Sequence, residues 1–135
     1  MAEPPRFTMT FTARPEHIDE NGHVNNAVWV AWVQDVAGAH WHEAGRAEDV
    51  AAFGWLVTRH EIDYRGNVGV GETVVATSWI DPEKTGVRCD RLIVFRKAGE
   101  DRPLVEARST WVMLNRETGR ITRPRAEMLA PFLPY

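Results

Sequence analysis

The sequence contains very little cysteine and has no long hydrophobic run. Cys89 is the only cysteine among 135 residues, so an internal disulfide and a zinc site built from thiolates are both excluded. Residues 1–6 lack the apolar core of a signal peptide, and no stretch is long and apolar enough to span a bilayer. We therefore expect a cytoplasmic protein without a membrane partner.

An excess of charge of one sign is also missing. Lys and Arg number 16 against 19 Asp and Glu, which gives a formal net charge of −3, and both signs are scattered along the chain. No broad basic surface is indicated, so we expect no nucleic-acid partner. What the sequence does have is apolar: 44% of the residues are hydrophobic and 10% are aromatic. This composition predicts one domain, residues 1–135, with a real core.

The most informative segment is the polar run Asp19-Glu20-Asn21-Gly22-His23-Val24-Asn25-Asn26, which lies directly before a helical pattern. An Asn-Gly pair favours a tight turn because both residue types tolerate positive φ, and Asn26 is a predicted helix N-cap. Free backbone N–H groups and the positive end of the helix dipole at this point would stabilise a carbonyl oxygen that gains negative charge. We therefore place the candidate active site at this turn.

Hydrophobic periodicity predicts the order of the elements. Apolar residues alternate with threonine over residues 7–13, which is the period of a strand with one buried face. From residue 27 they recur at helical spacing, so one long helix is predicted to end near Gly45. A polar, alanine-rich link through residues 48–52 follows. Further strands are predicted at 55–64, 73–80, 87–97 and 104–114, with an extended segment at 120–122 and a short helix at 126–129.

This order predicts an α+β fold in which a long helix lies on one antiparallel sheet of five or six strands. The bulky residues Trp29 and Trp32 on the helix need cover around much of its circumference, and a curved sheet wrapped around the helix would supply it. Such a sheet has an open edge. A symmetric dimer that extends the sheet would pair that edge.

The element order and the segment 19–26, followed by Trp29 and Trp32, resemble the hotdog-fold thioesterases of the 4-hydroxybenzoyl-CoA thioesterase type. The resemblance spans nearly the whole chain and is most specific in the stretch Asp-x-x-Gly-His-Val-Asn-Asn. It implies a single hotdog thioesterase domain that hydrolyses acyl thioesters of coenzyme A or acyl carrier protein. It also implies a homodimer or homotetramer with sites at the subunit interface, and we expect no cofactor.

The spacing Asp19-x-Asn21-x-His23 is also similar to the motif of plant-type acyl-ACP thioesterases, in which all three residues are assigned to catalysis. By the resemblance, Asp19 is a general base or a nucleophile, and the backbone amide near Asn26 polarises the thioester carbonyl. One carboxylate is enough for this chemistry because thiolate is already a good leaving group. Asn21 would position Asp19 or the water, and His23 would orient the water or hydrogen-bond the thioester oxygen.

Three aromatic residues are the expected substrate contacts: Trp29, Trp32 and Tyr64. The two tryptophans follow the catalytic turn and would line an acyl pocket, although core packing is their simpler interpretation. A basic set on the strands would either meet the phosphates of coenzyme A or form an ordinary charged face: Arg65, Arg88, Arg91, Arg96 and Lys97.

A metal site is not expected. His40 and His42 are two residues apart and so lie on different faces of the helix, and residues 19–22 lack the remaining acidic ligands of a calcium loop. Two other functions stay open. A hotdog dehydratase resembles the pattern Asp-x-Asn-Pro-x-His, with proline where this chain has Gly22, and a noncatalytic acyl-thioester binding module would lose the polar residues that the turn retains.

Overall fold

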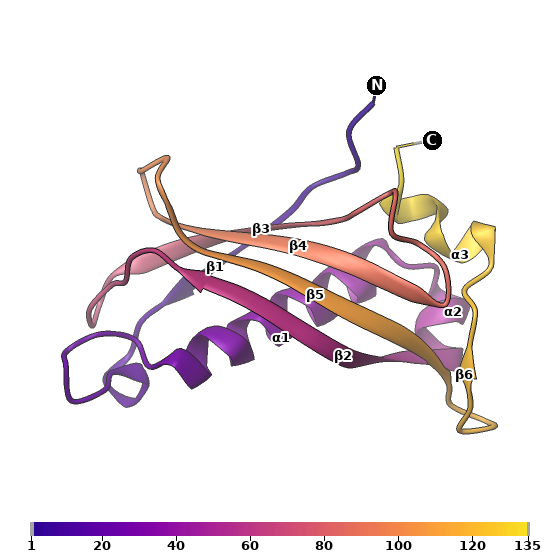
Figure 1. Ribbon diagram of the computed structural model, residues 1–135, viewed down its shortest axis with the longest axis horizontal. Helices are drawn as coiled ribbons and strands as arrows, with labels where there is room; N and C mark the ends of the chain where they lie inside the picture. The colour runs from indigo at the N-terminus through magenta and orange to yellow at the C-terminus, as the bar shows by residue number, and fades with distance from the viewer. Residues whose placement is uncertain (1, 135) are drawn as a thin grey trace.

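The structure, a computed structural model that describes residues 2–134, is a six-stranded antiparallel sheet curved around one long helix (Figure 1). The strands are β1 (Phe7–Thr12), β2 (Phe53–Tyr64), β3 (Thr73–Ile80), β4 (Arg88–Lys97), β5 (Pro103–Asn115) and β6 (Ile121–Thr122). The helices are α1 (Asn26–Ala44), α2 (Ala47–Ala52) and α3 (Ala126–Leu129), with 3-10 turns η1 (Pro15–His17) and η2 (Ala130–Phe132). The predicted α+β architecture is confirmed.

The order of strands in the sheet leaves two edges, β1 and β2. The order is β1-β3-β4-β5-β2, and β6 extends the pairing of β5. Strands β3, β4 and β5 follow one another as hairpins, whereas β2 pairs with the far side of β5 and shifts register between Val57 and Arg59. At 12 residues, β2 is the longer of the two edge strands. Its outer row of backbone groups has no partner within residues 2–134.

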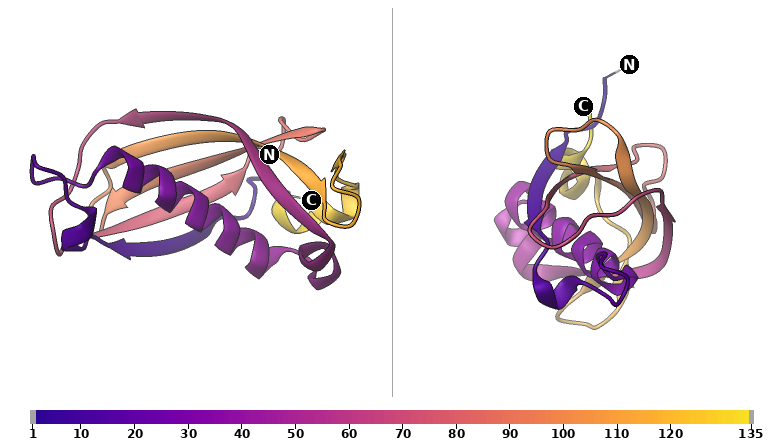
Figure 2. Two further views of the ribbon diagram at one scale, coloured as in Figure 1. Left: turned by 90° about the horizontal axis from the view of Figure 1, so that it is seen from below. Right: turned by 90° about the vertical axis from the view of Figure 1, so that its left-hand side faces the viewer.

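The core lies between α1 and the concave face of the sheet, as the end-on view in Figure 2 shows. The indole of Trp29 is fully buried and meets Trp32 and Phe95 edge-on, with ring centroids 5.1 Å apart in both pairs. Trp32 in turn stacks on Phe11 of β1 at 4.9 Å. The predicted stripe of buried residues on the helix is confirmed, because Trp29, Trp32, Val33, Val36, Ala37 and His40 are all buried.

Two local predictions are wrong. The N-cap of α1 is Asn25 and not Asn26, because the Asn25 side chain accepts the N–H of Ala27 at 2.9 Å. The predicted link at residues 48–52 is part of helix α2, whose first turn is held by a 2.7 Å ion pair between Arg46 and the buried carboxylate of Asp49. A short helix held by an ion pair has no apolar stripe, so periodicity does not reveal it.

Candidate active site

The polar turn before α1 is closed by hydrogen bonds of Asp19. The Asp19 N–H donates to His23 O at 2.9 Å, and the Gly22 N–H donates to Asp19 O at 3.1 Å. The Oδ1 atom of Asp19 accepts the N–H groups of Asn21 at 2.9 Å and His23 at 3.4 Å. Gly22 has a φ of +79°, which a residue without Cβ adopts at little cost. The tight turn predicted from the Asn-Gly pair is confirmed.

The second carboxylate oxygen of Asp19 is uncommitted. Within residues 2–134, Oδ2 has no hydrogen-bond or ion-pair partner, whereas Oδ1 is fixed by two backbone donors. The side chain is half-buried at the surface of the turn. A carboxylate held by one oxygen with the other free can take a proton from water or attack a carbonyl carbon.

The start of α1 offers a free donor next to this turn. The N–H of Ala27 donates to Asn25 Oδ1 and that of Val28 to Asn25 O, both at 2.9 Å, whereas the N–H of Asn26 has no acceptor in the described chain. Tyr64 at the end of β2 reaches the same place, because its hydroxyl donates to Asn26 O at 3.5 Å. Burial raises the pKa of this phenol. The structure thus brings the predicted residues Asn26 and Tyr64 together.

A loop between β2 and β3 supports the turn, and the sequence gives no signal of this. The Val24 N–H donates to Val68 O at 3.2 Å, and the Asn67 side-chain amide donates to Val24 O at 3.1 Å. Glu72 accepts the N–H of Gly69 at 2.7 Å and pairs with Lys97. These two contacts lower the pKa of Glu72, and the nearby His23 adds to the effect. Since 43 residues separate Asn67 from Val24, only the fold joins them.

The remaining predicted site residues divide into exposed and buried ones. Asn21 and His23 are exposed, and neither side chain makes a hydrogen bond within residues 2–134, so their catalytic roles stay predictions. Trp29 is 0% and Trp32 4% exposed. Neither indole lines one of the two described cavities, so the structure favours core packing for both and their contact with substrate stays a prediction.

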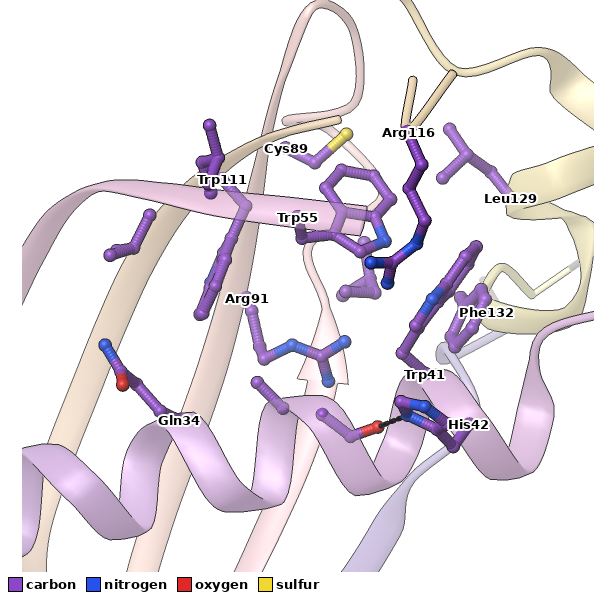
Figure 3. A pocket seen from close by; sticks show the side chains of 15 residues that line it. Gln34, Trp41, His42, Trp55, Cys89, Arg91, Trp111, Arg116, Leu129 and Phe132 are labelled. Atoms are coloured by element: carbon purple, nitrogen blue, oxygen red, sulfur yellow. Dashed lines mark hydrogen bonds between the residues drawn. The ribbon is translucent and has the colours of Figure 1, made fainter. Parts of the chain in front are cut away.

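One of the two described cavities lies beside the C-terminal half of α1 and not at the turn (Figure 3). It has a volume of about 410 Å³. The ring of Trp41 forms one wall, with Trp55 edge-on at 5.6 Å and Phe132 stacked at 5.7 Å. Trp111 from β5 lines another side. The α1 residues that line this cavity run from Gln34 to His42, about 12–24 Å along the helix axis from Asn26 at about 1.5 Å per residue. The cavity and the turn of Asp19 are therefore separate in one protomer.

A buried arginine lines this cavity. Arg91 is only 6% exposed, and its Nη1 donates to His40 Nδ1 at 2.7 Å and to Ser78 Oγ at 2.8 Å. Burial and, less strongly, the charge of Arg91 lower the pKa of His40 to about 3, so the ring is neutral and its Nδ1 accepts. Burial lowers the pKa of Arg91 to about 10, which leaves the guanidinium charged at neutral pH.

The placement of Arg91 corrects its interpretation as a possible surface contact for coenzyme A phosphates, because a buried side chain cannot meet a surface nucleotide. A signal for the burial was present in the sequence. Side chains alternate between the two faces of a strand, and Arg91 shares the parity of the buried residues Cys89, Ile93 and Phe95. Arg88, by contrast, is exposed at the start of β4.

The histidines of α1 do not converge on a common site. His40 is in the core, with its ring stacked on Phe7 at 5.0 Å, and His42 is exposed with Nδ1 2.8 Å from Gly38 O. Among residues 2–134, no group of three or more His, Cys, Asp or Glu side chains is placed to hold a metal ion. No helix in this range combines the length and apolarity needed to cross a bilayer.

Comparison with known proteins decides the family. The model of the acyl-ACP thioesterase N-terminal domain matches residues 4–132. The chain belongs to this thioesterase family. A chloroplastic acyl-[acyl-carrier-protein] hydrolase of Cuphea viscosissima is 32% identical over 82 residues, which make up 60% of this chain and 19% of that protein. This family member therefore spans about a fifth of the length of the curated relatives that it matches.

Solved structures share the fold of this family member at low sequence identity. An acyl-ACP thioesterase from Bacteroides thetaiotaomicron superposes with a TM-score of 0.79 at 21% identity, over 93% of this chain and 52% of that one. A hypothetical protein from Staphylococcus aureus, solved in complex with CoA, superposes with a TM-score of 0.80 at 18% identity, over 95% of this chain and 82% of that one. The predicted hotdog fold is confirmed.

Proposed function

We propose that this protein hydrolyses acyl thioesters of coenzyme A to a free acid and a thiol, with Asp19 as general base or nucleophile. The observation that carries the proposal is that two groups around the start of α1 have no hydrogen-bond partner within residues 2–134: Asp19 Oδ2 in the turn and the Asn26 N–H at the first helical residue. Membership of a thioesterase family over residues 4–132 supports the reaction class.

Asp19 would act on the attacking side of the reaction, and the Asn26 N–H would stabilise the negative charge on the carbonyl oxygen. In the general-base route, Asp19 Oδ2 takes a proton from water while the water oxygen bonds to the thioester carbon. In the nucleophilic route, Oδ2 bonds to that carbon and water then hydrolyses the resulting anhydride. In both routes the carbonyl oxygen becomes an oxyanion that accepts from the Asn26 N–H, and the C–S bond breaks as thiolate leaves. Asn21 and His23 would position the water.

The proposed active unit is a homodimer formed through β2, which two-fold pairing could extend to a homotetramer. An edge strand of 12 residues presents a long row of unpaired backbone groups. When β2 pairs antiparallel with its own copy, the Tyr64 end of one strand lies beside the Phe53 end of the other. Tyr64 contacts the start of α1, whereas Trp55 and Leu56 line the cavity. Such pairing would bring the turn of one protomer toward the cavity of its partner.

Acyl carrier protein is the second candidate carrier. The matched family model and the relative from Cuphea viscosissima are both named for acyl-ACP, whereas the Staphylococcus aureus neighbour was solved with CoA. The carrier does not change the chemistry at Asp19, because both deliver the acyl group as a thioester.

A thiol-release assay tests the proposal. We expect wild-type protein to release thiol from at least one of a panel of short, long and aromatic acyl-CoA and acyl-ACP substrates. The ratio of kcat/KM between a CoA thioester and the ACP thioester of the same acid identifies the carrier. Absence of release from every member of the panel would overturn hydrolysis and favour a noncatalytic binding module.

A further inference from the structure

The cavity beside the C-terminal half of α1 has apolar walls. Three indoles and the ring of Phe132 line it, and Ile80 and Leu129 are among its other apolar lining residues. Its volume of about 410 Å³ is within the range of about 300–1,000 Å³ that is typical of small-molecule sites. The walls therefore suit a ligand with an aliphatic or aromatic body.

The polar groups of this cavity include several hydrogen-bond donors and no carboxylate. No aspartate or glutamate is among its lining residues, all of which lie in the described part of the chain. The indole N–H groups of Trp41 and Trp111 are buried without an acceptor. In the view of Figure 3, the guanidinium of Arg116 lies between Trp41 and Trp55, and that of Arg91 extends toward Trp41. This arrangement lacks an anion.

Arg91 is the buried cation of this cavity that has no carboxylate partner in the described chain. Its Nη1 contacts are the neutral groups of His40 and Ser78, and no carboxylate within residues 2–134 pairs with it. Its Nε and Nη2 atoms have no hydrogen-bond acceptor in that range either. A buried cation without a counter-charge is unfavourable, so a ligand that supplies the charge gains binding free energy. A carboxylate matches the two-pronged geometry of a guanidinium.

We propose that this cavity binds an organic acid with an apolar body, whose carboxylate pairs with Arg91. The carboxylate has two possible sources. It belongs either to a free monocarboxylic acid or to the far end of a dicarboxylic acyl group that is carried as a thioester. The pairing with Arg91 does not depend on the proposed hydrolysis, because binding of a free acid is measured without turnover.

Tryptophan fluorescence and calorimetry test the pairing with octanoate and octanamide, which share a body and differ in charge. We expect wild-type protein to bind octanoate about 10- to 100-fold more tightly than octanamide, the usual effect of a charged hydrogen-bonded pair. Arg91→Met should remove this preference, and Arg91→Lys should keep part of it. Arg102→Met is the matched control, because Arg102 is exposed and makes no ion pair among residues 2–134. It should bind as wild type does.

Equal affinity of wild-type protein for the two ligands, or no saturable binding of octanoate, would overturn the proposal without any variant. A folded Arg91→Met protein that still prefers octanoate would overturn it as well. Thiol release distinguishes the two sources of the carboxylate. If the ligand is a dicarboxylic acyl group, the KM should be about tenfold lower for suberyl-CoA than for octanoyl-CoA, and Arg91→Met should abolish this difference. If the ligand is a free acid, the two KM values should be equal and octanoate should inhibit. Failure of both thioesters to react would contradict only hydrolysis.

Discussion

The two ends of α1 differ in how they hold a charged side chain. At the N-terminal end, Asp19 lies at the surface and two backbone N–H groups from its own turn fix one of its oxygens. Toward the C-terminal end, Arg91 is buried and held by side chains from α1 and β3. The turn is a local structure, whereas the arginine site exists only after the sheet has closed over the helix.

The comparison also separates reactivity from recognition. A carboxylate near water can accept a proton from it, which general-base chemistry requires. A guanidinium that is removed from water in a cavity lined by indoles interacts more strongly with an anion, because the local dielectric is low. A candidate reactive group in the preceding turn thus lies near one end of α1, and a candidate recognition group on β4 lies beside its other half.

Replacing Asp19 should abolish most of the thioester hydrolysis and leave the buried Arg91 site intact. Asp19→Asn keeps an oxygen that accepts the N–H groups of Asn21 and His23, so the turn should persist while kcat/KM falls about 100-fold or more. His23→Ala should cause a smaller loss. Thiol release measures both rates. Glu20→Gln is the control, because Glu20 is exposed in the same turn. An unchanged rate in Asp19→Asn with a folded protein would refute the assignment.

Titration of His40 tests how strongly the buried site near the C-terminal end of α1 contributes to the pH dependence of stability. The unfolded ring gains a proton near pH 6.5, whereas burial and Arg91 hold the folded pKa at about 3. Between these values the unfolded state binds more protons, so the free energy of unfolding should fall by about 1.4 kcal/mol per pH unit as the pH decreases. His40→Gln should remove this contribution, and the exposed His42→Gln should not. Urea unfolding at pH 4, 5 and 6 measures it, and parallel slopes for wild type and His40→Gln would contradict it.

A charge on β2 should weaken the proposed dimer and so separate the turn of one protomer from the cavity of its partner. Leu56 is 46% exposed on this edge strand. Leu56→Lys would add a lysine of the kind by which edge strands prevent pairing with another chain. We expect the dimer dissociation constant to rise about fivefold in sedimentation velocity. Val87→Lys is the matched control, since Val87 is also 46% exposed but lies outside the strands. Equal association of both variants would exclude this edge from the interface.

Several elements of the fold were predictable because their signals are local. The helix over Asn26–Ala44 and the strand over Thr73–Ile80 follow directly from periodicity and β-branched composition. The Asn-Gly turn follows from backbone preferences at positive φ. Helix α2 and the Asn25 cap escaped prediction because an ion pair and a one-residue choice of cap leave the hydrophobic pattern unchanged.

By itself, the sequence determined the polar turn, the helix that follows it and the alternation of each strand, because these depend on neighbours within a few residues. It also determined that Asp19 precedes the start of that helix. Only the tertiary structure decided that Asn67 supports the turn, and that Arg91 lines an aromatic cavity while its Nη1 donates to His40 and Ser78. Such contacts join residues that are distant in sequence, and they form only when the sheet and its loops pack against α1 and the turn before it.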